Sequence, residues 1–276
     1  MPRIDAHQHF WEFNPARESW VTEDMAVIRR DFLPQELQPL LQEHGFDGCV
    51  LVQTAQPEHE NEILLEWARA HEFIKGVVGW VDFFAADIEE RLSRLSQHPK
   101  LKGFRYVLQG AEDKALMLQP AFQHGIAQLR RYGFSYDILI YPDQLAYTAE
   151  LTAAFPDQPF VLNHLAKPDI KGGDFQTWRK AMEAFAAQEN VCCKVSGLVT
   201  QADWQNWQKR DFTPYLDTLA EVFGPKRLLF GSDWPVCLVA ASYAEVLGLV
   251  QEYFSPFSPQ EQELVFGGNA VAFYKL

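Results

Sequence analysis

Short apolar segments recur along the whole chain, and longer segments with helical spacing separate them. Eight of these segments fit buried β-strands. They cover residues 3–10, 48–55, 75–83, 101–109, 134–141, 160–166, 191–198 and 227–233. Between strands, apolar side chains recur every three to four residues, as over 59–71 and 117–132. This alternation of strands and helices predicts an α/β fold with a parallel sheet.

The spacing of the strands predicts how the sheet is closed. Consecutive strands begin about 26 to 45 residues apart, enough for a strand, a helix and two loops. Eight such units in a row predict one (β/α)8 TIM barrel that occupies residues 1–276 as a single domain. The alternative is an open doubly wound sheet, but the chain has no early G-x-G-x-x-G or Walker sequence. Residues 11–33 show little periodicity and predict an extended loop over the barrel mouth.

Composition narrows the class of partner. Of the 276 residues, 47% are hydrophobic and 22% are charged, as in an ordinary globular protein. The formal charge of −13 disfavours nucleic acid and anionic membranes as partners and leaves a small molecule. With no long apolar run and no signal sequence, we expect a cytoplasmic protein. No prediction of oligomeric state follows.

Polar residues collect where the predicted strands end. Catalytic side chains of (β/α)8 barrels lie at the C-terminal ends of the strands. Those ends carry His7, His9, Gln53, Asp82, Arg105, Gln109, Asp137, Tyr141, His164, Lys167, Lys194, Ser196 and Asp233. In the first strand, IDAHQHF, period-2 alternation would direct Asp5, His7 and His9 to one face.

Four of these side chains suit a metal ion. His7, His9, His164 and Asp233 offer three imidazoles and a carboxylate, a ligand set for one divalent ion such as zinc with positions left for water and substrate. Each residue also has a plain structural interpretation. The two N-terminal histidines could be solvated, Asp233 could cap a helix that begins at Trp234, and His164 could bond its strand neighbours.

Three motifs, in order along the chain, carry a family resemblance. IDAHQHFW at residues 4–11, NHLAKP at 163–168 and FGSDWP at 230–235 resemble the amidohydrolase superfamily, and within it the sugar-lactone hydrolases and 2-pyrone-4,6-dicarboxylate lactonase. SGLVTQADW and FGSDWPVCLVAASY are most similar to L-fucono- and L-rhamnono-lactonases. The fourth and fifth strands lack the ligands of binuclear members, so the resemblance implies at most one metal. The resemblance also allows a metal-independent enzyme.

The resemblance gives the strand-end residues expected roles in hydrolysis of an L-fucono-, L-rhamnono- or L-galactono-type lactone. Asp233 and His164 are the expected catalytic residues, with Asp233 as the general base. His7, His9, His164 and Asp233 would hold the ion, or the imidazoles would bond the lactone carbonyl directly. The residues expected to bind substrate are Arg105, Lys167, Trp11, Tyr141 and Trp234. Arg105 has an alternative role in an ion pair with Asp137.

Two other functions fit the same residues. A metal-dependent decarboxylase on this scaffold would also use Arg105 and Lys167, because its substrate is an anion. A non-catalytic protein that binds sugar acids is the second alternative. The intact set of His7, His9, His164 and Asp233 favours an enzyme.

Overall fold

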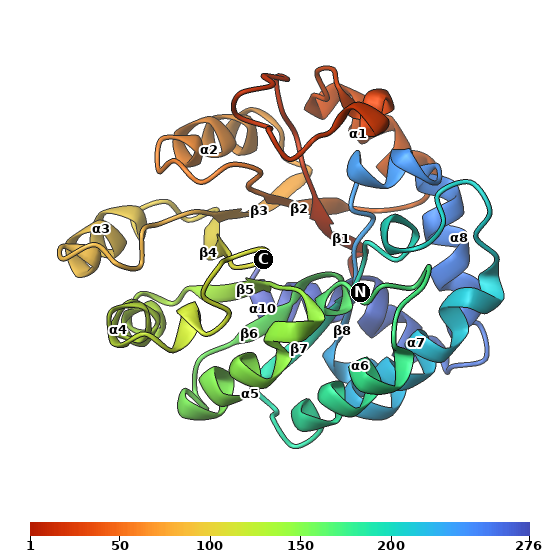
Figure 1. The fold of residues 1–276 in the computed structure, drawn as a ribbon. Coiled ribbons are helices and arrows are strands. Elements are labelled where there is room, and N and C mark those ends of the chain that lie inside the picture. The colour runs from red at the N-terminus through yellow and green to blue at the C-terminus, as the bar shows by residue number, and fades with distance from the viewer.

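The computed structural model describes residues 1–276 as a barrel of parallel strands surrounded by helices (Figure 1). The eight strands follow one another in chain order, and each consecutive pair is hydrogen-bonded in parallel. The strands are β1 (Ile4–Gln8), β2 (Gly48–Val52), β3 (Ile74–Gly79), β4 (Leu101–Val107), β5 (Ser135–Leu139), β6 (Phe160–Leu162), β7 (Val191–Val195) and β8 (Leu228–Phe230). The predicted (β/α)8 architecture is confirmed.

The first and last strands meet just beyond the end of β8. The backbone N–H of Asp233 donates to the carbonyl of His7 at 2.8 Å, and the N–H of His9 donates to the carbonyl of Trp234 at 2.8 Å. Closure of the barrel therefore brings the H-x-H of the first strand beside the aspartate that follows the eighth.

Helices cover the outside of the barrel. They are α1 (Pro34–Glu43), α2 (Glu60–Ala70), α3 (Ile88–Leu95), α4 (Pro120–Leu129), α5 (Leu145–Ala154), α6 (Phe175–Met182), α7 (Lys209–Phe223), α8 (Tyr243–Phe254), α9 (Pro259–Glu263) and α10 (Asn269–Tyr274). The helix predicted over 59–71 corresponds to α2. The segment predicted over 117–132 is divided, because Pro120 has no N–H to donate and begins α4 as its first residue.

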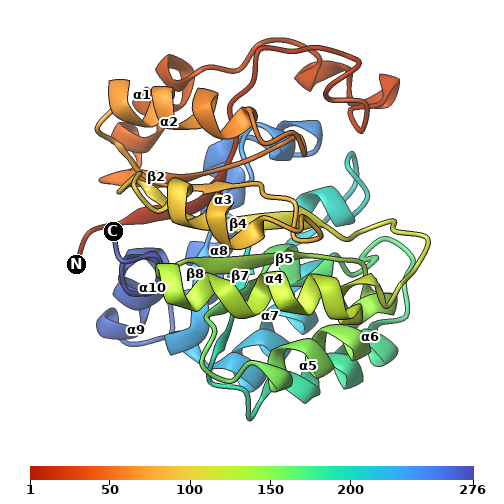
Figure 2. The same ribbon diagram turned by 90° about the vertical axis from the view of Figure 1, so that its left-hand side faces the viewer.

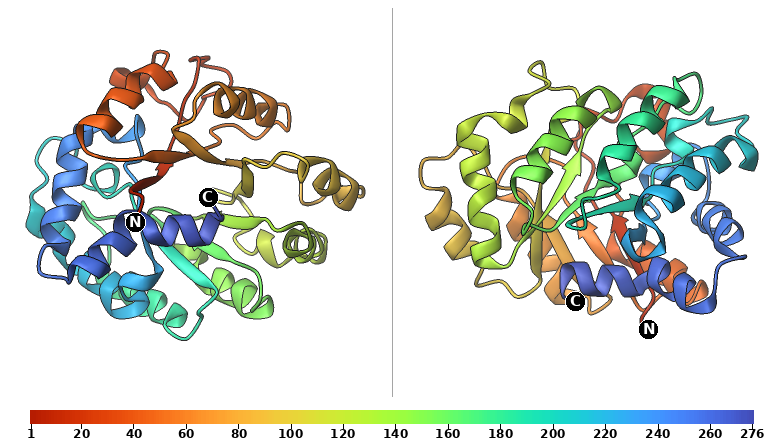
Figure 3. Two further views of the ribbon diagram at one scale, coloured as in Figure 1. Left: turned by 180° about the vertical axis from the view of Figure 1, so that it is seen from behind. Right: turned by 90° about the horizontal axis from the view of Figure 1, so that it is seen from below.

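Two apolar clusters hold the barrel together. The larger one fills the space between the strands and the helices. The smaller one lies inside the barrel and comprises Ile4, Ala6, Val50, Val52, Val78, Val161, Leu229, Ala270 and Tyr274. Its last two members belong to α10, which crosses the end of the barrel at which both termini lie (Figure 3, left). The C-terminal helix therefore closes this end.

The loop between β1 and α1 lies toward the other end of the barrel (Figure 2). It contains the short helix η1 (Glu23–Ile28), and Trp11 and Phe32 pair across its base with two backbone hydrogen bonds of 2.9 Å. The segment that lacked periodicity in the sequence is thus an ordered loop tied at both ends. None of the helices has the length and apolar character that crossing a membrane requires.

Candidate active site

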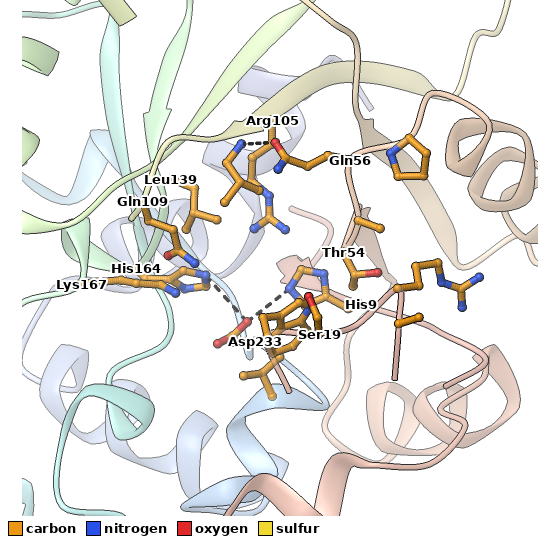
Figure 4. A pocket seen from close by; sticks show the side chains of 17 residues that line it. His9, Ser19, Thr54, Gln56, Arg105, Gln109, Leu139, His164, Lys167 and Asp233 are labelled. Atoms are coloured by element: carbon orange, nitrogen blue, oxygen red, sulfur yellow. Dashed lines mark hydrogen bonds and ion pairs between the residues drawn. The ribbon is translucent and has the colours of Figure 1, made fainter. Parts of the chain in front are cut away.

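A cavity of about 530 Å³ opens at the C-terminal ends of the strands (Figure 4). Five of the residues that line it were predicted from the sequence: His9 after β1, Arg105 on β4, His164 and Lys167 after β6, and Asp233 after β8. The remaining lining residues are Ala16, Arg17, Ser19, Trp20, Thr54, Ala55, Gln56, Pro57, Val107, Gln109, Leu139 and Val236.

A β-bulge directs both N-terminal histidines to the site. Between Asp5 and Gln8 the pairing of β1 with β2 shifts by one residue. His7 therefore does not share the side of Asp5, whose carboxylate accepts the backbone N–H of Ser232 at 2.9 Å. The prediction that simple alternation groups Asp5 with both histidines was wrong, because an extra residue in one strand reverses the alternation. Gly231 leaves room for His7, since a Cβ there would lie 2.6 Å from the Cβ of His7.

A left-handed turn at the end of β6 positions His164 and Lys167. Four consecutive residues, 164–167, have φ between 51° and 58°. Left-handed backbone costs a non-glycine residue on the order of 1 kcal/mol, so the surroundings must hold this turn in place. The indole N–H of Trp178 does so by donating to the carbonyl of Leu165 at 2.9 Å. The strand was predicted to run to residue 166, but β6 ends at Leu162, and the turn rather than strand alternation aims His164 inward.

Asp233 also lies beyond its strand, with φ of 59°. Its Oδ1 is 3.4 Å from Nε2 of His9 and 3.8 Å from Nε2 of both His7 and His164. Burial by itself raises the pKa of this carboxyl, but His164, His9 and Lys167 outweigh it and the net pKa is lowered. Asp233 is therefore an ionised carboxylate at neutral pH.

The imidazoles around Asp233 are neutral. Burial lowers the pKa of His164 to about 3, and burial followed by the charge of Lys194 lowers that of His7 well below its usual value. Burial also lowers the pKa of His9. Neutral imidazoles can bind a metal ion, accept a proton or donate an N–H.

The donor atoms of this site fit a divalent metal ion. One ligand atom each from His7, His164 and Asp233 lies within 4.8 Å of the others, and all three residues are buried. His9 adds a fourth donor, because its Nε2 is 3.2 Å from that of His7. Neutral imidazole nitrogens with a carboxylate oxygen are the donors that zinc takes in catalytic sites.

Arg105 is held by amide groups. Its guanidinium donates to the backbone carbonyl of Gln53, and its Nη1 lies 3.4 Å from Oδ1 of Asn163. The alternative of an Arg105–Asp137 ion pair is wrong, because Asp137 pairs with Lys194 at 2.6 Å. The cation of Arg105 therefore remains at the cavity wall.

Three predicted substrate contacts lie away from the cavity. Trp11 is buried, with its indole N–H donating to the carbonyl of Arg30 at 2.8 Å. Trp234 is buried too, and its ring packs edge-on against Phe10 and Phe32. Both expectations are corrected: these indoles fill the base of the loop beside the barrel closure. Tyr141 is 39% exposed and lines a separate shallow hollow, which it shares with Lys167.

Loop residues complete the cavity, and the sequence did not reveal them. Arg17, Ser19 and Trp20 come from the loop after β1, and Gln56 comes from the loop after β2. Strand periodicity cannot find such residues, because loops have none. The only signal was the length of the first loop, which predicted a cover over the mouth without naming its contacts.

Comparison with known proteins agrees with this geometry. L-fucono-1,5-lactonase from Burkholderia multivorans is 38% identical over 99% of this chain and 96% of its own length, and the L-fucono-1,5-lactonase from Burkholderia ambifaria is 34% identical with the same coverage. A crystal structure of a Burkholderia multivorans amidohydrolase with bound zinc superposes with a TM-score of 0.97 over the whole of both chains, at 38% identity. The amidohydrolase family model matches residues 4–276. With its barrel closure, its H-x-H and its strand-eight aspartate all inside that match, this chain is a member of the amidohydrolase family.

Proposed function

We propose that the protein hydrolyses a sugar lactone to its aldonic acid. The observation that carries this proposal is the buried carboxylate of Asp233, ringed by neutral imidazoles at 3.4–3.8 Å at the wall of the cavity. The full-length similarity to two L-fucono-1,5-lactonases supports a lactone of the L-fucono, L-rhamnono or L-galactono type.

Asp233 acts as the general base. Its carboxylate takes a proton from water while the water oxygen forms a bond to the lactone carbonyl carbon. When the tetrahedral intermediate collapses, the bond to the ring oxygen breaks and Asp233 returns the proton to that oxygen. One carboxylate thus serves both steps and is regenerated. The carboxylic acid product then loses its own proton to solvent.

Cations at the cavity wall stabilise the oxygen that gains charge. Arg105 and Lys167 line the same cavity as Asp233. Burial lowers the pKa of Lys167 to about 8, so its side chain is mainly an ammonium at neutral pH. Charged donors fixed in advance around a developing oxyanion are among the strongest contributors to acyl-transfer catalysis.

The site residues could hold a metal ion while Asp233 remains the general base. His7, His9, His164 and Asp233 would hold it, and zinc suits their nitrogen and oxygen donors. When bound, such an ion supplies Lewis-acid polarisation of the lactone carbonyl.

A pH-indicator assay tests the proposal, because ring opening releases a proton at neutral pH. Purified protein is given a panel of aldonolactones, once with chelator and once with added zinc. We expect turnover of six-carbon L-lactones in at least one condition. The proposal fails if no lactone on the panel is opened in either condition. Release of CO₂ from carboxylated aromatic acids would then identify the decarboxylase alternative.

A further inference from the structure

Lys194 is a charged residue beneath the catalytic cavity that the proposed mechanism does not use. It lies on β7, and its side chain is entirely buried. Its ammonium nitrogen is 2.6 Å from Oδ2 of Asp137 and 3.1 Å from Nδ1 of His7. Lys194 therefore connects a buried carboxylate to one of the site histidines.

Asp137 is fixed from three directions. Besides Lys194, the hydroxyl of Tyr274 lies 2.9 Å from both of its oxygens and donates its one hydrogen to this carboxylate, and the amide of Asn163 donates to Oδ2 at 3.0 Å. Tyr274 belongs to α10, which closes the far end of the barrel. The carboxylate group is thus held rigidly. Burial lowers the pKa of Lys194, and the 2.6 Å contact with Asp137 opposes that shift and favours the ammonium, because an unpaired buried charge would be very costly.

The contact with Lys194 determines which nitrogen of His7 carries the proton. An ammonium group has three donors and no acceptor. At 3.1 Å it can only donate to His7, so Nδ1 is the acceptor. A neutral imidazole has one N–H, and that N–H must therefore lie on Nε2, the nitrogen nearer the cavity.

A second contact, at the other ring nitrogen of His7, agrees with the same tautomer. Nδ1 of His9 is 2.7 Å from the carbonyl of Val52, so it carries the proton and leaves a lone pair on Nε2 of His9. That lone pair is 3.2 Å from Nε2 of His7. Two lone pairs would repel at this distance, whereas an N–H on His7 donates to His9. Nη1 of Arg105 lies 3.4 Å from the same nitrogen and equally far from Oδ1 of Asn163, which can accept its N–H.

We propose that Lys194 is a positioning residue that holds His7 with its N–H on Nε2, so that His7 offers the cavity a hydrogen-bond donor and binds a metal ion only after that proton is displaced. The two histidines of the motif then differ. His9 has the usual arrangement of a zinc ligand, an N–H on the outer nitrogen that donates to a carbonyl. At His7, the ammonium of Lys194 contacts Nδ1, the outer nitrogen, where a zinc ligand would have a hydrogen-bond acceptor. The carboxylate of Asp137 contacts Lys194 and not His7.

The proposed role of Lys194 predicts the direction in which metal affinity changes when this lysine is replaced. An ion at Nε2 of His7 has to displace the proton there and lies near the ammonium charge of Lys194. Removing that charge should strengthen metal binding, whereas removal of an ordinary supporting residue weakens it by about 10- to 100-fold. This opposite sign separates a specific action on His7 from a general loss of structure.

Histidine nitrogen NMR on the intact, metal-stripped protein tests the tautomer directly. In ¹⁵N-histidine-labelled protein, with His7 assigned by comparison with His7→Gln, we expect the protonated nitrogen of His7 to be Nε2. In Lys194→Met the N–H should appear on Nδ1 in a substantial fraction of molecules, and in Lys194→Arg, which keeps a donor, it should stay on Nε2. A proton on Nδ1 of His7 in the unsubstituted protein would overturn the proposal.

Zinc affinity, measured by competition with a chromophoric chelator, gives the second readout. Lys194→Met should bind zinc at least about tenfold more tightly than the unsubstituted protein. Lys171→Met, which changes a lysine that is 63% exposed, should bind it unchanged. If Lys194→Met does not fold because Asp137 is left unpaired, Lys194→Met with Asp137→Asn removes both charges and should show the same gain. Unchanged or weaker zinc binding in the folded variant contradicts the proposal. Neither readout needs lactone turnover, so both remain decisive if the proposed activity fails.

Discussion

The layer of buried residues beneath the cavity, here called the floor, is built differently from the mouth of the cavity. On the floor, His7, Asp137, Lys194 and Tyr274 are buried, and each has a hydrogen-bond partner within 3.2 Å. At the mouth, Gln109 presents a buried side-chain oxygen with no partner in the protein. The floor is complete without substrate, whereas the mouth holds polar groups that substrate can satisfy.

This difference assigns separate tasks to the two regions. Polar groups that already have partners fix the positions of catalytic atoms, so changes there should act mainly on kcat or on stability. Groups without partners gain theirs when substrate binds, so changes there should act mainly on KM. Four substitutions test this division, beginning with the largest expected effect.

Asp233→Asn should lower kcat by a factor on the order of 10² to 10⁴, because it keeps the volume of the side chain and removes the base. Steady-state hydrolysis of the best lactone measures the loss, with circular dichroism to establish folding. Asp157→Asn, at a carboxylate that is 77% exposed, is the matched control and should leave kcat unchanged. A folded Asp233→Asn protein with more than about a tenth of the original kcat would move the base elsewhere, with His164 the first residue to examine.

Lys167→Met should lower kcat/KM by about 10- to 100-fold, the range expected when a charged hydrogen-bond donor is lost. Thermal stability should change little, because burying the ammonium opposes folding. The pH profile identifies the charge: the ammonium is the form below its pKa of about 8, so kcat/KM should fall as the pH rises through that value. This alkaline decline should disappear in Lys167→Met and persist in Lys171→Met. A decline that survives in Lys167→Met belongs to another group.

Gln109→Ala should raise KM by about 2- to 10-fold with little change in kcat, since one neutral hydrogen bond contributes about 0.5–1.5 kcal/mol. Substrate saturation curves provide both constants. Gln97→Ala, in the loop that follows α3, is the control for an amide far from the cavity. If kcat falls and KM stays constant, Gln109 belongs functionally with the floor.

Tyr274→Phe should have the smallest effect on turnover, within about threefold, because the hydroxyl reaches the site only through Asp137 and Lys194. Stability should decrease by about 1–3 kcal/mol, the cost of removing one partner of a buried charged group. Urea unfolding measures it, with Tyr147→Phe as the exposed control. An unchanged free energy of unfolding would show that the floor does not depend on α10.

The sequence predicted the positions of all eight strands, because apolar side chains inside and outside a parallel barrel leave a continuous signal. It did not predict where they end. The segments predicted over 160–166 and 227–233 end at Leu162 and Phe230, and the backbone then turns left-handed at His164 and Asp233. Side-chain periodicity carries no information about such turns.

The sequence predicted which residues form the candidate site, but not the backbone turns and side-chain contacts that bring them together. His7, His9, His164 and Asp233 converge as expected, although a bulge and two left-handed turns place them there. The substrate contacts predicted for Trp11 and Trp234 were wrong, because a sequence cannot distinguish an indole that packs a loop from one that faces a sugar. A lysine within the apolar strand VCCKV signals a buried charge, but its partners come from elements far along the chain.

The central claim is that Asp233 activates water and never bonds to the substrate. Hydrolysis of the best lactone in H₂¹⁸O, with enzyme in excess so that each molecule turns over once, tests this most directly. A general base predicts that the aldonic acid from the first turnover carries one ¹⁸O and that the peptide containing Asp233 carries none. An unlabelled first product, with ¹⁸O in the side chain of Asp233, would show that the carboxylate attacks the lactone itself and would contradict the account.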